Sequence, residues 1–221
     1  MVKRKKDYFV GAWNIMKSGE QWLNWAKELQ SIAQNGLTYT KDVFDQERFE
    51  RVREIAAEIV SRYSGLSVRR VKDLFCNETG FQTPKLDTRG VVFKDGKILL
   101  VRENDGRWSL PGGWVDFDQT VKTNTEKEVK EEAGLEVRAV KVLAIHDRNQ
   151  HNKPVYAYNV CKFFVLCEVI GGSFQKNAET TESRYFAKDE LPPLAEEKNS
   201  KEQVEMCFSA YSDAAWKMPF D

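Results

Sequence analysis

The stretch Gly112–Leu135, GGWVDFDQTVKTNTEKEVKEEAGL, decides the fold. Residues from about 120 to 133 have the composition of a helix, and Gly134 predicts its end because glycine readily adopts the left-handed conformation that closes helices. A helix turns by about 100° per residue, which places three glutamates within one arc of about 100°. These residues are Glu128, Glu131 and Glu132. The stretch therefore predicts a glycine-rich loop followed by a helix with one carboxylate-rich face.

Each pair of like charges at these spacings destabilises a helix by roughly 0.2–0.5 kcal/mol. The three carboxylates can be solvated, paired with the neighbouring Lys127 and Lys130, or neutralised by a hard cation. Mg²⁺ and Mn²⁺ prefer oxygen ligands and are often shared with substrate phosphates.

The segments around this stretch carry strand signals. Asp95-Gly96 lies between two apolar runs and predicts a hairpin. Further strands are expected at Gly90–Phe93, Lys97–Val101, Trp108–Leu110, Val155–Ile170 and Arg184–Phe186. Ser200 and Gln203 have the spacing of a capping box and predict a second helix. The order of strands, helix, strands and helix predicts an α+β sandwich with a mixed sheet.

The N-terminal third shows helical periodicity instead. Ser18 to Gln21 has capping-box spacing and begins a helix that we expect to end at Asn35-Gly36. A second helix is expected from near Asp45 to Gly65, and a third after Ser67. We predict a small helical domain over residues 1–76, a linker over 77–86 and the α+β domain over 87–221. Three short helices make a small core, so docking or dimerisation is expected.

Composition narrows the class of protein. The 221 residues are 41% hydrophobic, and 34 basic residues balance 34 acidic ones, so the net charge indicates neither nucleic acid nor membrane binding. No apolar run approaches the roughly 20 residues that span a bilayer. The basic start is followed by no apolar core of a signal peptide, so a cytoplasmic protein is expected. The four cysteines lack metal-ligand spacing and are interpreted as free thiols.

The central stretch resembles the Nudix box of hydrolases that cleave nucleoside diphosphates linked to another group. That pattern is a glycine, five residues, a glutamate, seven residues, then Arg-Glu-apolar-any-Glu-Glu-any-Gly-apolar. Here it runs from Gly113 through Gln119 to Lys127–Leu135, with matching spacing throughout. Gln119 replaces the first glutamate and Lys127 replaces the arginine, so the number of metal ions is left open. The resemblance implies an α/β/α sandwich.

The resemblance extends beyond the box. Residues 22–30, 36–42 and 74–80 are similar to the helical extension of a bacterial Nudix branch. That branch includes a CDP-choline pyrophosphatase that also trims RNA 3′ ends, and members regarded as ADP-ribose pyrophosphatases. Both departures from the box pattern are frequent in it.

The resemblance implies a role for several residues. Divalent metal, Mg²⁺ or Mn²⁺, would be held by Glu128, Glu131, Glu132 and the carbonyl group of Gly112. The general base is left open between Glu128 and two glutamates on the loop before the last strand, Glu179 and Glu182. Candidate substrate contacts are Arg102, Arg107, Trp114 and His151, each of which is also compatible with an ordinary surface or packing role.

The expected function is metal-dependent hydrolysis of a small nucleotide substrate by a homodimer, with CDP-choline favoured because of the N-terminal extension. ADP-ribose is one alternative. Removal of nucleotides from RNA 3′ ends is another, for which Lys3–Lys6 and Arg69-Arg70 are candidate phosphate contacts. A nucleotide-binding module without catalysis is the third, supported by Gln119 and Lys127 alone.

Overall fold

The computed structural model describes residues 21–221. The capping box expected from Ser18 and the basic segment Lys3–Lys6 therefore begin outside the described residues. The chain divides between Thr83 and Pro84 into two compact units, which are treated separately below. Within residues 21–221, no helix combines the length and the apolar character that crossing a membrane requires.

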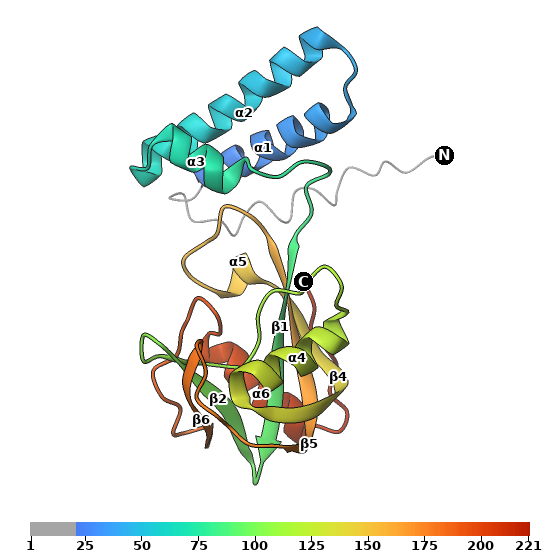
Figure 1. Ribbon diagram of the computed structural model, residues 1–221, viewed down its shortest axis with the longest axis vertical. Coiled ribbons are helices and arrows are strands. Elements are labelled where there is room, and N and C mark those ends of the chain that lie inside the picture. Colours follow the sequence, from blue (N-terminus) through green and yellow to red (C-terminus); the bar gives the residue numbers. More distant parts are fainter. Residues whose placement is uncertain (1–20) are drawn as a thin grey trace, which may run out of the picture. The chain divides into compact units, whose positions relative to one another are not determined.

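The described part of the first unit consists of helices (Figure 1). Their bounds are α1 (Gln21–Tyr39), α2 (Val43–Ser64) and α3 (Val68–Phe75). The side chains of Asp42 and Ser67 accept hydrogen bonds from backbone N–H groups in the first turns of α2 and α3, and Gly65 ends α2 with φ 74°. Small side chains such as Ala33, Ala56 and Ala57 are fully buried and allow close helix packing.

The predicted end of the first helix at Asn35-Gly36 is wrong, because α1 continues to Tyr39. A β-carbon at Gly36 would lie 2.4 Å from the ring of Phe49 on α2. Glycine at this position therefore allows α1 and α2 to approach closely and does not end the helix. The second helix also begins before the expected Asp45, because Asp42 caps it by accepting the N–H of Asp45 at 3.0 Å.

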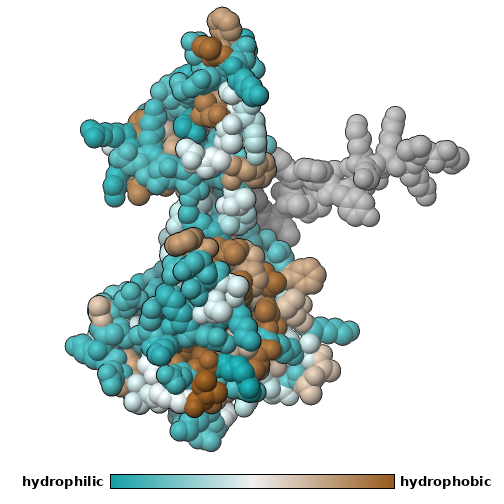
Figure 2. All heavy atoms as spheres, turned by 45° about the vertical axis from the view of Figure 1, so that its right-hand side comes forward, coloured by the Kyte–Doolittle hydropathy of each residue, from teal (hydrophilic) through white to brown (hydrophobic). Residues whose placement is uncertain are grey.

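Apolar side chains also reach the surface of the first unit (Figure 2). The exposed fraction of the residue is half or more for Trp25, Tyr39, Val43, Phe44, Tyr63, Leu74 and Phe81. The hydrophobic residues of this unit thus exceed what its own small core buries.

The second unit contains a mixed sheet. Its strands are β1 (Lys85–Lys94), β2 (Lys97–Glu103), β3 (Trp108–Ser109), β4 (Leu135–Asp147), β5 (Val160–Gly172) and β6 (Thr180–Phe186). Its helices are α4 (Val121–Ala133), α5 (Arg148–His151) and α6 (Lys201–Ser212). The strand order is β3-β2-β1-β5-β4, and β6 pairs with β2. β1 and β5 are parallel, whereas the β1–β2 hairpin turns through Asp95 and Gly96, both with positive φ.

Helices cover both faces of this sheet (Figure 1). Val92, Leu99 and Val101 face α4 and pack with its Val129 and Ala133. The alternate positions face α6, and this second core includes Val91, Ile98, Leu100, Val204 and Cys207. The expected α+β sandwich and its mixed sheet are confirmed.

The long strand β4 was not expected from the sequence. Its register with β5 shifts at three places, which interrupts the alternation of apolar and polar residues that identifies strands. The strand expected from Val155 begins only at Val160, because residues 148–151 form α5 and a loop follows. All four cysteines are free, as expected.

Candidate active site

The glycine loop before α4 runs along β1. Backbone N–H groups of Thr88 and Gly90 donate to the carbonyl oxygens of Gly113 and Pro111 at 2.9 and 2.8 Å. Gly112 has φ 146°, and a β-carbon there would lie 1.9 Å from the carbonyl oxygen of Thr88. Only glycine fits at this position, so the loop lies directly against the strand.

Helix α4 is tied to the same strand by Asn124, which is fully buried. Its amide donates to Thr88 Oγ1 at 2.9 Å and its Oδ1 accepts the N–H of Asp116 at 3.2 Å. Thr120 caps the helix at its start and Gly134 ends it with φ 70°. The loop, the strand and the helix thus form one fixed frame.

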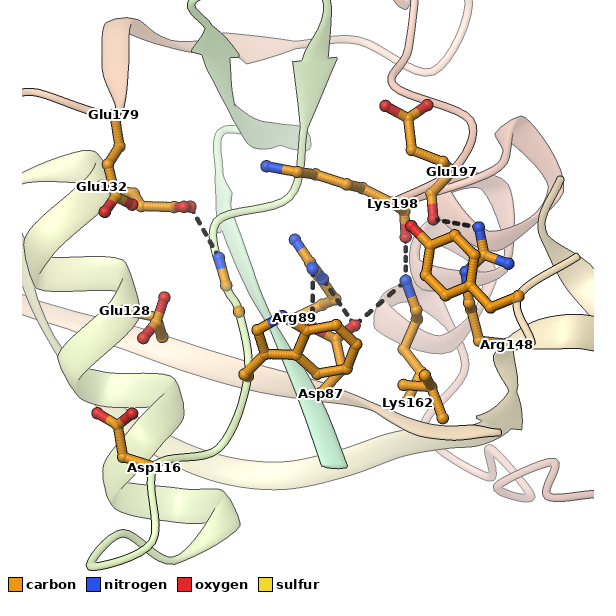
Figure 3. Close-up of a pocket in the computed structure, with 15 residues that line it drawn as sticks. Asp87, Arg89, Asp116, Glu128, Glu132, Arg148, Lys162, Glu179, Glu197 and Lys198 are labelled. Carbon is orange, nitrogen blue, oxygen red and sulfur yellow. Dashed lines mark hydrogen bonds and ion pairs between the residues drawn. The ribbon is translucent and has the colours of Figure 1, made fainter. Parts of the chain in front are cut away.

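This frame lines a cavity of about 390 Å³, within the size range of small-molecule sites. Figure 3 shows Asp116, Glu128, Glu132 and Glu179 on one side of the cavity and Arg148 and Lys162 on the other, with Asp87 and Arg89 between them. The cavity therefore has an acidic wall and a basic wall.

Two glutamates of α4 form the centre of the acidic wall. Glu132 is 4% exposed, and its Oε2 accepts the N–H of Gly112 at 2.9 Å. Burial raises the pKa of Glu132 to about 7 and also raises the pKa of Glu128. Removing water from a carboxylate disfavours its charged form, so both groups are poised to gain from a nearby cation.

Glu131 has a different environment. Its side chain is 56% exposed and forms an ion pair with Lys127 at 3.0 Å, and it does not line the cavity. Lys127 also lies 3.2 Å from both Asp116 and Glu128. These contacts raise the pKa of Lys127, through its hydrogen bond with Glu131 above all. The lysine at the box arginine position thus bridges three carboxylates.

The acidic wall fits a hard divalent cation. A β-carbon at Gly113 would lie 2.8 Å from Glu128 Oε2, so glycine leaves the space that this carboxylate occupies. The buried Glu132 and the partly buried Glu128, beside a backbone loop, provide the oxygen donors that Mg²⁺ and Mn²⁺ prefer. Gln119, in contrast, lies outside the cavity lining and donates to Asp118 at 3.4 Å.

The structure places the two glutamates expected on this loop in different environments. Glu179 lines the cavity, and its N–H donates to Asn177 Oδ1 at 2.9 Å. Asn177 in turn donates to the carbonyl oxygen of Glu131 at 2.8 Å, which fixes this loop to the last turn of α4. Glu182 instead lies within β6, 3.9 Å from Arg102, and does not line the cavity. It was expected on the loop, but β6 begins earlier, at Thr180.

Three of the candidate substrate contacts lie outside the cavity lining. Arg102 donates to the carbonyl oxygen of Gly106. Arg107 forms a two-pronged ion pair with Glu197 at 2.7 and 2.6 Å. His151 stacks on His146 with ring centroids 3.9 Å apart, and its Nε2 lies 2.7 Å from Asp221. Their side chains are thus engaged with the protein itself.

The fourth candidate, Trp114, does line the cavity and is 47% exposed. It also lines a neighbouring hollow of about 320 Å³ together with Leu86 and Tyr158. The rings of Trp114 and Tyr158 lie 6.2 Å apart. An aromatic surface therefore adjoins the charged cavity.

The basic wall contains residues that sequence reasoning missed. Asp87 on β1 is the register partner of Lys162 on β5, and their side chains form an ion pair at 3.2 Å. Arg89 binds both oxygens of Asp87 at 2.7 and 3.1 Å. The available signal was the run Asp87-Thr88-Arg89 at the start of an apolar strand, where buried polar residues are unusual.

Comparison with protein families gives two matches along the chain. A model described as "UDP-X-like, N-terminal oligomerisation domain" matches residues 20–75. A model described as "NUDIX domain" matches residues 84–207. The boundary between the two matches coincides with the division of the structure between Thr83 and Pro84.

Two relatives match nearly the whole chain, and a third matches about two thirds of it. A Bacillus subtilis (strain 168) protein, provisionally named as the ADP-ribose pyrophosphatase YjhB, is 37% identical over 94% of this chain and 100% of its own length. A solved structure of a UDP-X diphosphatase is 31% identical, covers 90% of this chain and 98% of its own, and has a TM-score of 0.60. A Streptococcus suis ADP-ribose pyrophosphatase structure is 53% identical over 63% of this chain and 100% of its own, with a TM-score of 0.59.

Proposed function

Since the chain belongs to the Nudix hydrolase family, whose members act on pyrophosphate bonds, we propose that it hydrolyses the pyrophosphate of a nucleoside diphosphate linked to another group. The observation that supports this most directly is the cavity with Glu128 and Glu132 on one wall, Arg148 and Lys162 on the other, and Arg89 between them (Figure 3). A pyrophosphate is a small polyanion that requires a cation at one side and positive side chains around it.

Nudix hydrolases generally use divalent metal ions, and the carboxylate oxygens of Glu128 and Glu132 are the groups that would hold one here. The carbonyl group of Gly112 is proposed as a third ligand, and the exposed Glu131 as an outer one. Mg²⁺ or Mn²⁺ matches this oxygen donor set. A bound divalent ion neutralises pyrophosphate charge and lowers the pKa of water.

The proton of the attacking water must be accepted by a group near the acidic wall. We assign this role to Glu179, because it lines the cavity and its loop is fixed to α4 through Asn177. Glu128 is the alternative if it is not fully engaged with a cation. Glu182 is assigned no role, since it pairs with Arg102 outside the cavity.

The proposed substrate preference rests on the names of the relatives. Two relatives carry the name ADP-ribose pyrophosphatase, so ADP-ribose is our first substrate. CDP-choline was favoured on the N-terminal extension, but the model that matches this extension is described as UDP-X-like. We propose that the nucleobase stacks on Trp114, beside the hollow that Tyr158 also lines. Aromatic stacking accepts any base and therefore ranks no nucleotide above another.

The first unit is proposed to join two copies of the chain. Its matching family model is described as an oligomerisation domain, and exposed aromatic residues such as Trp25 and Phe44 remain on its surface. Arg69 and Arg70, the candidate RNA contacts, are exposed on α3 of this unit. The residues that line the cavity all belong to the second unit, and RNA stays an arm of the assay rather than a proposal.

The test is a product assay with Mg²⁺ or Mn²⁺. ADP-ribose, CDP-choline, UDP-linked sugars, nucleoside triphosphates and a short RNA are offered separately to the full chain. Formation of a nucleoside monophosphate and the phosphorylated partner group from a linked diphosphate is the expected result. Faster hydrolysis of unlinked triphosphates than of every linked substrate would contradict the proposal.

A further inference from the structure

The basic wall of the cavity holds more positive charge than it can neutralise. Asp87, Arg89, Arg148 and Lys162 are each at most 5% exposed. Asp87 forms ion pairs with Arg89 at 2.7 Å and with Lys162 at 3.2 Å. Among the described residues, no carboxylate lies within ion-pair distance of Arg148. Three buried cations therefore share one anion.

Arg148 in particular has only uncharged partners. Its guanidinium donates to the carbonyl oxygens of Pro154 at 2.5 Å and Glu197 at 3.3 Å, and to the side chain of Asn149 at 3.2 Å. The ring of Tyr156 covers it, with 3.3 Å between Cζ and the ring centroid. Its Nε is buried and has no hydrogen-bond partner among residues 21–221. A buried charged donor without an acceptor is a costly arrangement.

The other charged residues of this wall already have partners. Glu197 is bound by Arg107 from outside the cavity, and Lys198 lies 2.6 Å from Glu103. Neither pair changes the excess of positive charge on Arg89, Arg148 and Lys162. Glu132 of the acidic wall offsets part of this excess through its charge interaction with Arg89, and a negatively charged molecule in the cavity would offset the remainder.

The buried environment also changes the pKa values of two of these cations. Burial lowers the pKa of Lys162 to about 7 and also lowers the pKa of Arg148. Both side chains are thus held in a place where their charge is disfavoured in the free protein. Each phosphate of a pyrophosphate that is linked at both ends carries one negative charge at neutral pH and offers oxygen acceptors to several donors at once. Such a group matches the excess of positive charge on this wall.

We propose that an anion subsite opposite the acidic wall holds a phosphate group of the substrate. The subsite consists of Arg89, Arg148 and Lys162, and Asp87 orients Arg89 and Lys162. This inference rests on the proposed function, because it assigns the substrate's second point of attachment in the same cavity (Figure 3). The acidic wall recognises phosphate only together with a cation, whereas this subsite recognises it directly.

The test therefore uses binding without metal. Inorganic pyrophosphate is titrated into the full chain in the presence of EDTA, and heat release is measured by isothermal calorimetry. The variants are Lys162→Met, which has similar length and no charge, and Arg148→Met. Lys130→Met is the matched control, since Lys130 is exposed and pairs with Glu136 on the surface. Circular dichroism establishes that each variant is folded.

The wild type and Lys130→Met are expected to bind pyrophosphate equally. Lys162→Met and Arg148→Met are expected to bind it about tenfold more weakly or worse, as for the loss of a charge-assisted hydrogen bond. With metal and ADP-ribose, Lys162→Met should raise KM more than it lowers kcat. A purely structural role would reduce the active fraction, and hence kcat, without changing KM.

Two results would overturn the proposal: absence of pyrophosphate binding by the metal-free wild type, or equal binding by the wild type and both subsite variants. The result of this binding test can be distinguished from the result of the hydrolysis assay that tests the proposed function. If no nucleotide is hydrolysed and yet pyrophosphate binding follows the expected order, the subsite stands and the proposed reaction is wrong.

Discussion

A β-carbon on Gly113 would lie 2.8 Å from Oε2 of Glu128, so the carboxylate of Glu128 occupies its position only because residue 113 has no side chain. The nearest atoms belong to the end of a flexible side chain rather than to backbone. A substituent there would displace the carboxylate and leave the sheet intact. The glycine of the box is thereby linked to the position of one proposed metal ligand.

Gly113→Ala is expected to move Glu128 and to weaken Mn²⁺ binding by about tenfold or more, as do changes in groups that orient metal ligands. Mn²⁺ affinity can be measured by electron paramagnetic resonance. Gly171→Ala is the matched control, since its β-carbon would meet only Glu136 Oε2 at 3.5 Å, an ordinary contact. Unchanged Mn²⁺ affinity in Gly113→Ala would separate Glu128 from the metal site.

Lys127 provides a second test of the acidic wall, because its ammonium group lies within 3.2 Å of Asp116, Glu128 and Glu131. Lys127→Met removes the charge that holds these carboxylates together and should lower kcat/KM by about tenfold or more. Lys127→Arg keeps the charge and restores the residue of the box pattern, so it should retain most activity. Equal losses in both variants would show that charge at this position does not matter.

Variants of Glu179 and Glu182 provide a matched test of which residue acts as the general base. Glu179→Gln is expected to lower kcat by about 100-fold or more and to remove the acidic limb of the pH–rate profile. Glu182→Gln changes a residue in β6 that pairs with Arg102 and should leave kcat nearly unchanged. The reverse order of effects would exclude Glu179 and return the role to Glu128.

The buried Lys162 makes the stability of the metal-free protein depend on pH. Its pKa is lowered from 10.5 to about 7, chiefly by burial. Between these values the unfolded chain binds one more proton than the folded one, so the free energy of unfolding rises with pH. Below about pH 7 the lysine is charged in both the folded and the unfolded state. The buried charge then lowers the free energy of unfolding by its full amount.

Thermal melts of the wild type and Lys162→Met from pH 6.5 to 9.5 measure this contribution. The melting temperature of the wild type is expected to rise toward that of Lys162→Met as the pH increases, with both proteins in EDTA. Parallel curves would show that Lys162 has an ordinary pKa in the folded protein.

The local elements of the site could be predicted from sequence because they depend on neighbouring residues. Helix α4, its end at Gly134 and the glycine loop before it follow from residue types at fixed spacing. The same reasoning failed at Gly36, where the reason for glycine is Phe49 on another helix. It also failed to separate Glu131 from Glu128, because helix periodicity does not show which part of a face lines a cavity.

The basic wall could not be assembled from sequence, since it depends on pairing between distant strands. Asp87 and Lys162 are neighbours only because β1 and β5 run parallel in one register. Arg148 enters the wall from α5, which follows a strand that the sequence did not reveal. Polar residues inside apolar strands were the only local sign of this arrangement.

Glu132 is the residue on which the proposed metal-dependent cleavage of a pyrophosphate depends most. The most direct test measures AMP and ribose 5-phosphate formed from ADP-ribose by the wild type, Glu132→Gln and Glu131→Gln. The wild type should be active only with a divalent ion, and Glu132→Gln should lose about 10²–10³ in kcat, the scale of removing one key electrostatic group. Glu131→Gln should lose about tenfold or less, since Glu131 is exposed beside Lys127. Full turnover by Glu132→Gln, or turnover that persists in EDTA, would contradict the account.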